Sequence, residues 1–145
     1  MSEIRIPLPW SAPPLSLNDR GYWRARAEKT AMARNTMLVL AAKHRLPRDA
    51  EHVTVQLHYR PRDRRRRDTD NLVATLKPIC DGLAAGTRKH PGYGMVPDDT
   101  PEFMAKPEPI IHEAIKGEPG AMWLTLTFAD PEHELADRFA REDHQ

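Results

Sequence analysis

The stretch from residue 53 to residue 83 constrains the fold more than any other part of the chain. Apolar residues alternate with polar ones over 53–59, which is the period of a half-buried β-strand. A charged junction follows, and apolar residues then recur at helical spacing over 72–83. Gly86 is a plausible stop for this helix. The sequence therefore predicts a strand that leads through a charged loop directly into an amphipathic helix.

The remaining segments complete a small α+β domain. A strand over 4–8 contains Pro7 and is followed by Pro9, which favours a sheet edge or an early exit from the sheet. A helix is expected from Arg20 to about Arg45. Residues 110–115 and 122–128 are expected to form two strands joined as a hairpin. The predicted order is β-α-β-α-β-β, with two main helices on one face of a mixed sheet.

Length and composition limit the class of protein. The chain of 145 residues fits one compact domain, residues 1–130, followed by a charged tail at 131–145. Residues 1–90 hold 18 lysines and arginines against nine acidic residues, whereas residues 91–145 hold four against twelve. This asymmetry indicates that the basic N-terminal part of the chain faces a polyanion, and that the acidic C-terminal part keeps the protein soluble or regulates it. The single cysteine, Cys80, excludes an internal disulfide, and no apolar run approaches the roughly 20 residues of a membrane span, so we expect a cytoplasmic protein.

The charged junction is where the chemistry concentrates. Four consecutive arginines at 64–67 run into Asp68 and Asp70, and a second acidic pair, Asp98 and Asp99, lies downstream. A phosphodiester nuclease needs cations that hold phosphate next to carboxylates that hold a divalent metal. All-oxygen ligands favour Mg²⁺, with Mn²⁺ as a substitute, over Zn²⁺. The cations expected to contact DNA phosphates are Arg64, Arg65, Arg66, Arg67, Arg20 and Arg24.

Each part of this pattern also has a structural interpretation. Asp68 or Asp70 would serve equally well as the cap of the helix that begins near Asn71. The Asp98-Asp99 pair would serve as a turn before a proline, and arginines on the first helix as a solvated face. Two such coincidences next to an arginine run are less probable than one active site.

The same motifs resemble the RusA-type Holliday junction resolvases. The resemblance covers about residues 4–128 and is carried by Arg-Arg-Arg-Arg-Asp-Thr-Asp-Asn-Leu at 64–72, Lys-Pro-Ile-Cys-Asp-Gly-Leu at 77–83 and Val-Pro-Asp-Asp at 96–99. It implies a homodimeric, Mg²⁺-dependent endonuclease that cuts four-way DNA junctions, in a bacterial or phage-infected cytoplasm. By position, it implies metal ligands at Asp68, Asp70 and Asp99, with Asp98 as a further candidate, and a functional lysine at Lys77.

One departure from the family pattern concerns this lysine. The family places it four residues after the second aspartate, whereas Lys77 comes seven residues after Asp70. At about 100° per residue, both spacings keep the lysine on the face of the aspartate, but the longer one moves it by about 4.5 Å along the helix. An ordinary surface pair between Lys77 and Asp81, four residues on, is the alternative interpretation.

The expected function is therefore a structure-specific endodeoxyribonuclease that resolves Holliday junctions in DNA recombination or repair, of the phage or prophage type. The sequence leaves two alternatives open. One is a nuclease of the same fold that acts on other branched or flap DNA, and the other is a protein that binds branched DNA without cleaving it. The arginine run and the small size disfavour a nucleotide-sugar transferase built around the Asp-x-Asp motif.

Overall fold

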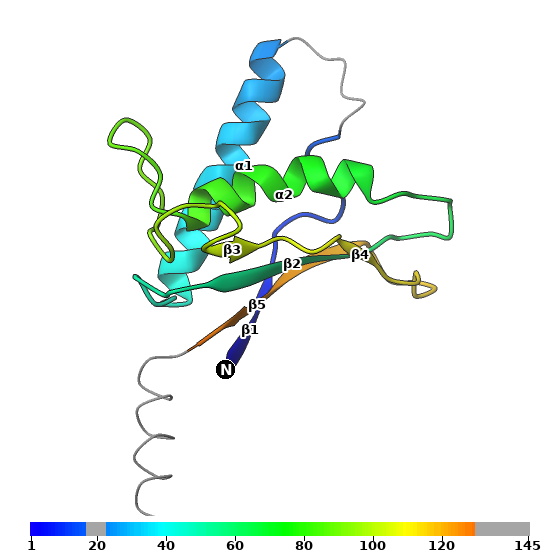
Figure 1. Cartoon of the computed structure of the whole chain (residues 1–145). Helices are drawn as coiled ribbons and strands as arrows, with labels where there is room; N and C mark the ends of the chain where they lie inside the picture. The colour runs from blue at the N-terminus through cyan, green and yellow to red at the C-terminus, as the bar shows by residue number, and fades with distance from the viewer. Residues whose placement is uncertain (17–22, 130–145) are drawn as a thin grey trace, which may run out of the picture.

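A five-stranded sheet with two helices on one side forms the architecture (Figure 1). The computed structural model describes residues 1–16 and 23–129, so Arg20 and the tail at 131–145 lie outside the described residues. The elements in order are β1 (Ser2–Pro7), α1 (Trp23–Lys43), β2 (Val53–Arg60), α2 (Asp70–Leu83), β3 (Met104–Ala105), β4 (Ile110–Ile111) and β5 (Ala121–Phe128). The predicted α+β class, with its two main helices and mixed sheet, is confirmed.

The sheet has the strand order β1-β5-β2-β3, and β4 also pairs with β2. β5 is antiparallel to both β1 and β2, whereas β3 and β4 are parallel to β2. β1 lies at the edge, with Pro7 opposite Trp123 in the register. Proline is acceptable there because an edge strand has one side without a partner.

The predicted hairpin between 110–115 and 122–128 is wrong. β4 is limited to Ile110–Ile111, and it lies on the opposite side of β2 from β5. β5 pairs with β2 along all eight residues, which satisfies far more backbone groups than a short hairpin would. Prolines at 107 and 109 lack N–H donors, which keeps the ladder between β4 and β2 short.

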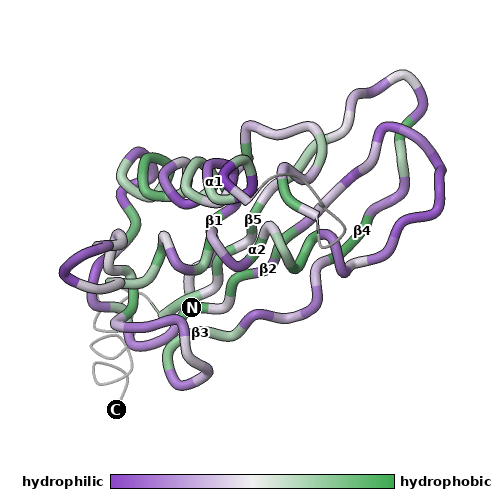
Figure 2. Tube along the Cα trace, turned by 90° about the horizontal axis from the view of Figure 1, so that it is seen from above, coloured by the Kyte–Doolittle hydropathy of each residue, from purple (hydrophilic) through white to green (hydrophobic). Residues whose placement is uncertain are grey.

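The core lies between the helices and one face of the sheet. Alternate residues of β2 and β5 are buried, and the register places them side by side: Val53, Val55, Leu57, Tyr59, Met122, Leu124, Leu126 and Phe128. Seen from above, α2 lies over β2, with α1 next to it (Figure 2). Burial of a side chain such as Leu57 contributes about 1.5–3 kcal/mol, so this face holds the layers together.

The end of α2 differs from the predicted one. The helix stops at Leu83 because Ala84 adopts an extended conformation and forms a bridge with Val96. Gly86 does not end the helix, but lies in the following loop with a φ of 71°. The excursion from 84 to 96 therefore leaves α2 and returns to its end. No helix in the described part of the chain is long and apolar enough to cross a membrane.

Candidate functional site

Two acidic side chains that are far apart in the sequence meet next to the end of α2. Asp81 lies in the last turn of α2, and Asp99 lies beyond the excursion that returns to Val96. Both line the same cleft, and the carboxyl group of each shifts the pKa of the other. Asp98 belongs to the same group, since its carboxylate accepts the backbone N–H of Asp99 at 2.8 Å. This pairing of Asp81 with Asp99 is the central feature of the site.

Backbone hydrogen bonds hold the excursion in place. Met95 donates to the carbonyl of Leu83 at 2.9 Å, and Ala85 donates to the carbonyl of Val96 at 2.9 Å. Gly92 donates to Ala85 at 2.8 Å, and a Cβ added at Gly92 would lie 1.8 Å from the carbonyl oxygen of Ala84. Only glycine permits this close approach of the two backbone segments. Because the segments are tied together, Asp99 is delivered to a fixed place next to α2.

The surroundings of the two carboxyl groups are mixed in charge. Burial raises the pKa of Asp81, as does the carboxyl group of Asp99, while Lys77 and Arg34 act in the opposite direction. Burial would also raise the pKa of Asp99, but its interactions with Asp81 and Lys106 lower it. The Nζ of Lys106 lies 3.6 Å from Oδ2 of Asp99. Two carboxylates this close repel one another unless a proton or a cation neutralises them.

Two clefts meet at Asp81. The first has a volume of ≈ 430 Å³ and includes Arg34, Asp98 and Asp99 in its lining. The second has a volume of ≈ 400 Å³ and is lined from α1 by Arg26 and Thr30, and from α2 by Val73, Ala74, Lys77 and Pro78. Because Asp81 lines both clefts, they are adjacent: the second lies between α1 and α2, and the first lies between Arg34, the end of α2 and the loops at 84–90 and 97–99. We call the two clefts together the interhelical groove.

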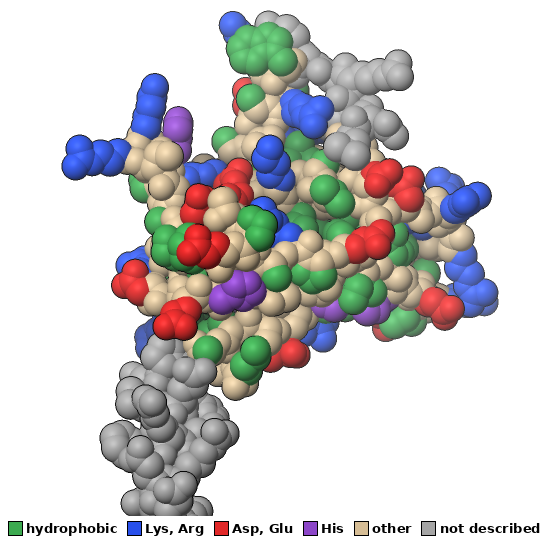
Figure 3. Space-filling model, in the orientation of Figure 1, with side chains coloured by type: hydrophobic (Ala, Val, Ile, Leu, Met, Phe, Trp, Pro, Cys, Tyr) green, Lys and Arg blue, Asp and Glu red, His purple; other side chains and the backbone are tan. Residues whose placement is uncertain are grey.

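The interhelical groove has cations along its length and acids at one end. On the face drawn in Figure 3, acidic and basic side chains are interspersed around the helices. The charge asymmetry between the two halves of the sequence therefore does not separate the charges in space on this face. An arrangement of this kind suits a ligand that carries negative charge and is accompanied by a cation.

Asp68 and Asp70 lie at the opposite end of α2. Both are exposed, and the backbone N–H of Asp70 donates to Oδ1 of Asp68 at 3.2 Å. Thr69 is the N-cap residue, but its side chain makes no capping hydrogen bond and instead donates to Glu108 at 2.6 Å. Asp68 thus satisfies one free N–H at the start of the helix, as the structural interpretation predicts.

The three predicted ligands do not converge within one protomer. Asp70 and Asp81 are separated by eleven positions of a helix, which corresponds to about 16 Å along its axis. Asp99 is held next to Asp81, so it is remote from Asp68 and Asp70. Within residues 1–16 and 23–129, no group of three or more His, Cys, Asp or Glu side chains is placed to hold a metal ion.

Lys77 lies between the two acidic ends of α2. Its spacing places it on the same exposed face as Asp70 and Asp81, about 6 Å along the axis from Asp81. It is exposed and lines the interhelical groove. The longer spacing from Asp70 therefore brings the lysine closer to Asp81 than to the predicted ligands at the start of α2.

The arginine run is organised by Asp63, which the sequence reasoning missed. Oδ1 of Asp63 accepts a hydrogen bond from Arg67 at 2.7 Å, and its Oδ2 pairs with Arg65 at 3.7 Å and Arg62 at 3.6 Å. The hydrogen bond from Arg67 is the main cause of a lowered pKa of Asp63. In the sequence, the only sign of this role is that Asp63 precedes Arg67 by four residues. Among the described residues, Arg64 and Arg66 form no ion pair.

Arg24 lies in the first turn of α1, where its guanidinium group stacks over the exposed ring of Trp23 at 5.3 Å. This end of α1 is far in sequence from the arginine run, and the contact leaves the charge of Arg24 on the surface. The structure thus describes five of the six predicted DNA-contacting arginines. Arg24 lies at the start of α1, and the other four lie in the loop between β2 and α2.

Comparisons with known proteins leave the family unassigned. No protein-family model matches the chain, and no curated protein matches it. The resemblance to RusA-type resolvases therefore depends on the motifs at 64–72, 77–83 and 96–99. To these motifs the structure adds the shared cleft of Asp81 and Asp99.

Proposed function

We propose that the protein is a Mg²⁺-dependent endodeoxyribonuclease that cleaves branched DNA, with four-way Holliday junctions as its substrate. The observation that carries this proposal is that Asp81 and Asp99 line one cleft, next to cations, and shift each other's pKa. Phosphodiester cleavage needs paired carboxylates near positive groups that hold the phosphate. The motifs shared with RusA-type resolvases supply the choice of substrate.

The acidic pair fits a hard divalent cation. Mg²⁺ is usually held by one or two carboxylates together with substrate phosphates and water, so two protein ligands are sufficient. Asp81 and Asp99 would be those ligands, with Asp98 as a further candidate. A bound Mg²⁺ supplies a bound water of lowered pKa and positive charge for the leaving oxygen. Mn²⁺, which accepts the same oxygen donors, would substitute.

The other side chains of the interhelical groove have separate roles in the proposal. Lys77 and Arg34 lie close enough to influence the charge of Asp81, and both line the clefts, so they would bind phosphate oxygens on either side of the acidic pair. Lys106 contacts Asp99 and would orient its carboxylate. Arg64 and Arg66, without ion pairs among the described residues, would hold more distant phosphates.

A homodimer, which the resemblance implies, gives Asp68 and Asp70 a place in the same site. If the α2 helices of two protomers run antiparallel, the start of one helix lies next to the end of the other. Asp70 would then approach the acidic pair of the partner subunit. Val73 and Ala74, which lie near the middle of the exposed face, are small enough for a close approach. Such a dimer also presents two sites to a roughly two-fold DNA junction.

A cleavage assay tests the proposal. Labelled four-way, three-way and flap substrates are incubated with the full chain, with and without Mg²⁺, and the products are separated on a gel. We expect symmetric cuts in the four-way junction that require Mg²⁺ and are absent with Asp99→Asn. Preferential cutting of a flap or a three-way branch would show that the protein is instead a nuclease for other branched or flap DNA. Tight junction binding without cutting in any metal would identify a DNA-binding protein instead.

A further inference from the structure

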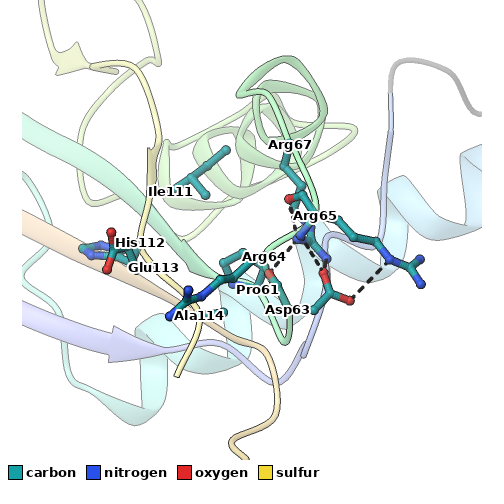
Figure 4. Close-up of a pocket in the computed structure, with 9 residues that line it drawn as sticks. All are labelled: Pro61, Asp63, Arg64, Arg65, Arg67, Ile111, His112, Glu113 and Ala114. Carbon is teal, nitrogen blue, oxygen red and sulfur yellow. Dashed lines mark hydrogen bonds and ion pairs between the residues drawn. The ribbon is translucent and has the colours of Figure 1, made fainter. Parts of the chain in front are cut away.

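A separate pocket lies at the C-terminal end of β2, outside the interhelical groove. It has a volume of ≈ 420 Å³ and is formed by two segments, 61–67 after β2 and 111–114 at and after β4. β2 and β4 run parallel, so both chains leave the sheet at the same edge. Its lining residues, all drawn in Figure 4, are Pro61, Asp63, Arg64, Arg65, Arg67, Ile111, His112, Glu113 and Ala114.

The arginines of this pocket differ in how they are held. Arg65 and Arg67 gather around Asp63 in Figure 4, and Arg67 also donates to the backbone carbonyls of Asp63 and Arg65 at 2.9 Å each. Arg64 instead lies on the side of segment 112–114, and it forms no ion pair with a described residue. The pocket therefore has a wall of fixed guanidinium groups and one cation that is available to a ligand.

The net charge of the lining favours an anion. Three arginines face two acidic residues, Asp63 and Glu113, which leaves an excess of one positive charge with His112 neutral. Asp63 is already engaged by Arg67 and Arg65, so its charge is compensated locally. The excess positive charge therefore lies with Arg65 and Arg67, which share Asp63, while Arg64 forms no ion pair with a described residue although Glu113 lines the same pocket. An anion with several oxygen atoms can use both the charge and a directed hydrogen bond.

His112 is held in a fixed orientation by a layered arrangement of rings. Its Nε2 is 2.9 Å from Nδ1 of His58, and Nε2 of His58 is 2.9 Å from the hydroxyl of Thr125. The ring of Trp123 stacks on both imidazoles, with centroid distances of 5.2 Å to His58 and 4.9 Å to His112. The guanidinium of Arg5 lies 4.6 Å from the Trp123 ring.

This arrangement leaves one ring nitrogen for a ligand. Both nitrogens of His58 and Nε2 of His112 have partners, whereas Nδ1 of His112 has none within residues 1–16 and 23–129. If Thr125 donates to His58, the proton between the two imidazoles belongs to His58, and Nδ1 of His112 then carries the other N–H. His112 lines the pocket, so in this tautomer the N–H would be a donor of fixed direction for a ligand bound there.

We propose that this pocket binds a phosphate group of the DNA backbone, with Arg64 supplying the charge and Nδ1 of His112 a directed hydrogen bond. Arg65 and Arg67, fixed by Asp63, form the rest of the cationic wall. The pocket adjoins the loop before α2, whereas the acidic pair lies about 16 Å along that helix, so the phosphate belongs to a different nucleotide from the one that is cleaved. The identity of the phosphate donor rests on the proposed function, but the phosphate site itself does not.

The first test uses inorganic phosphate, the full chain and no Mg²⁺. Titration is followed by NMR, through the backbone amides of residues 111–114 and the imidazole signals of the wild-type protein. We expect a saturable shift at 111–114 and at His112. Arg64→Ala and His112→Gln should each weaken the affinity about tenfold, as loss of a charge-assisted hydrogen bond does. Lys116→Ala, which removes an exposed cation outside the pocket, should leave it unchanged.

The second test identifies the source of the phosphate. Binding of a DNA junction is measured at several salt concentrations without Mg²⁺, and Arg64→Ala should flatten the salt slope by about one unit. An absence of a saturable shift with inorganic phosphate, or an equal affinity in Arg64→Ala and Lys116→Ala, would overturn the site. Inorganic phosphate binding with an unchanged salt slope would overturn its assignment to DNA. Neither readout involves cleavage, so a failure here is distinguishable from a failure of the proposed nuclease.

Discussion

Asp81 and Asp99 line the same cleft and shift each other's pKa, although one belongs to α2 and the other to a loop that returns to it. This arrangement leads to a prediction about metal binding. Asp99→Asn and Asp81→Asn should each remove most of the stabilisation by Mg²⁺, because each removes one anionic ligand. They should reduce junction cleavage on the order of 100-fold or more.

The measurement needs a readout that is independent of cleavage. Thermal unfolding with increasing Mg²⁺ supplies it, since a ligand at 100 times its Kd stabilises the folded state by about 2.7 kcal/mol. The matched control is Asp49→Asn, which changes an exposed aspartate outside both clefts. Equal stabilisation by Mg²⁺ in Asp99→Asn and in the wild type would rule out the acidic pair as the metal site.

The elements that local pattern determines could be predicted from the sequence. β2 alternates buried and half-buried residues along its whole length, and α2 has a clear apolar face, so both were found within two residues of their bounds. β3 and β4 could not be predicted from alternating hydrophobicity, because two residues are too few to show an alternation. Their pairing with β2 depends on the return of the chain from 84–96, which is a tertiary effect.

The candidate site was predictable only in part. The motif identified Asp99 and the face of α2, but it assigned Asp81 no more than a surface pair with Lys77. The position of Asp99 beside Asp81 is set by backbone hydrogen bonds, such as those from Met95 and Ala85, which any residue type can make. Only the close approach of Gly92 to the backbone of Ala84 requires a particular residue type, namely glycine. A single glycine in the sequence does not show which segment it approaches.

A glycine substitution tests how the excursion positions Asp99. Gly92→Ala places a Cβ 1.8 Å from the carbonyl oxygen of Ala84, so the two backbone segments must separate. We expect a loss of roughly 1–3 kcal/mol in the free energy of unfolding, and a loss of cleavage because Asp99 moves. Urea denaturation measures the first effect.

Gly117→Ala is the control for this substitution. Gly117 has a φ of 83°, but a Cβ there meets no atom within 4 Å. It should cost about 1 kcal/mol through backbone strain alone and leave cleavage unchanged. If Gly92→Ala unfolds at the same urea concentration as the wild type and cleaves normally, the excursion does not hold Asp99 in the way described.

The arginine run predicts a specific salt dependence. Arg66 is exposed and forms no ion pair with a described residue, so its charge is available to a phosphate. Arg66→Ala should weaken junction binding and flatten the salt slope by about one unit, because one fewer counterion is released. Measurement of Kd at four or more salt concentrations checks this. An unchanged slope would place the DNA surface elsewhere.

The histidine pair predicts a pH effect on stability. Burial is the main cause of a lowered pKa of His58, with further contributions from His112 and Arg5, while Glu3 acts in the opposite direction. A histidine whose pKa is lowered by folding takes up its proton more readily when unfolded. Its contribution to stability is therefore present above the usual histidine pKa of about 6.5 and is lost as the pH falls through its lowered value.

Thermal unfolding between pH 7.5 and 5.5 measures this effect, above the range in which most carboxylates titrate. The wild-type midpoint should fall with decreasing pH over this window. His58→Gln, which keeps a polar group without titrating, should show a smaller fall. The same pH dependence in both proteins would contradict the assignment to His58.

The separation of Asp70 from Asp99 within one protomer leads to a prediction about pairs of variants. If each metal site takes Asp70 from one protomer and Asp99 from the partner, Asp70→Asn and Asp99→Asn homodimers both lose cleavage but keep junction binding. In a mixed dimer, however, both substitutions fall in one site and the other site is intact. Mixing two inactive variants should therefore restore cleavage at one of the two strands.

The experiment uses the two variants co-refolded at equal concentration, and a nicked-junction assay that detects cleavage of a single strand. Random mixing makes about half of the dimers mixed, so a substantial fraction of the wild-type nicking rate is expected. Asp81→Asn mixed with Asp99→Asn is the control, because those residues line one cleft of the same protomer and no intact site can form. Nicking in the control mixture would mean that Asp81 and Asp99 of one protomer do not serve the same site. No nicking in the Asp70→Asn mixture would place the site within a single protomer, with Asp70 outside it if Asp70→Asn alone still cleaves.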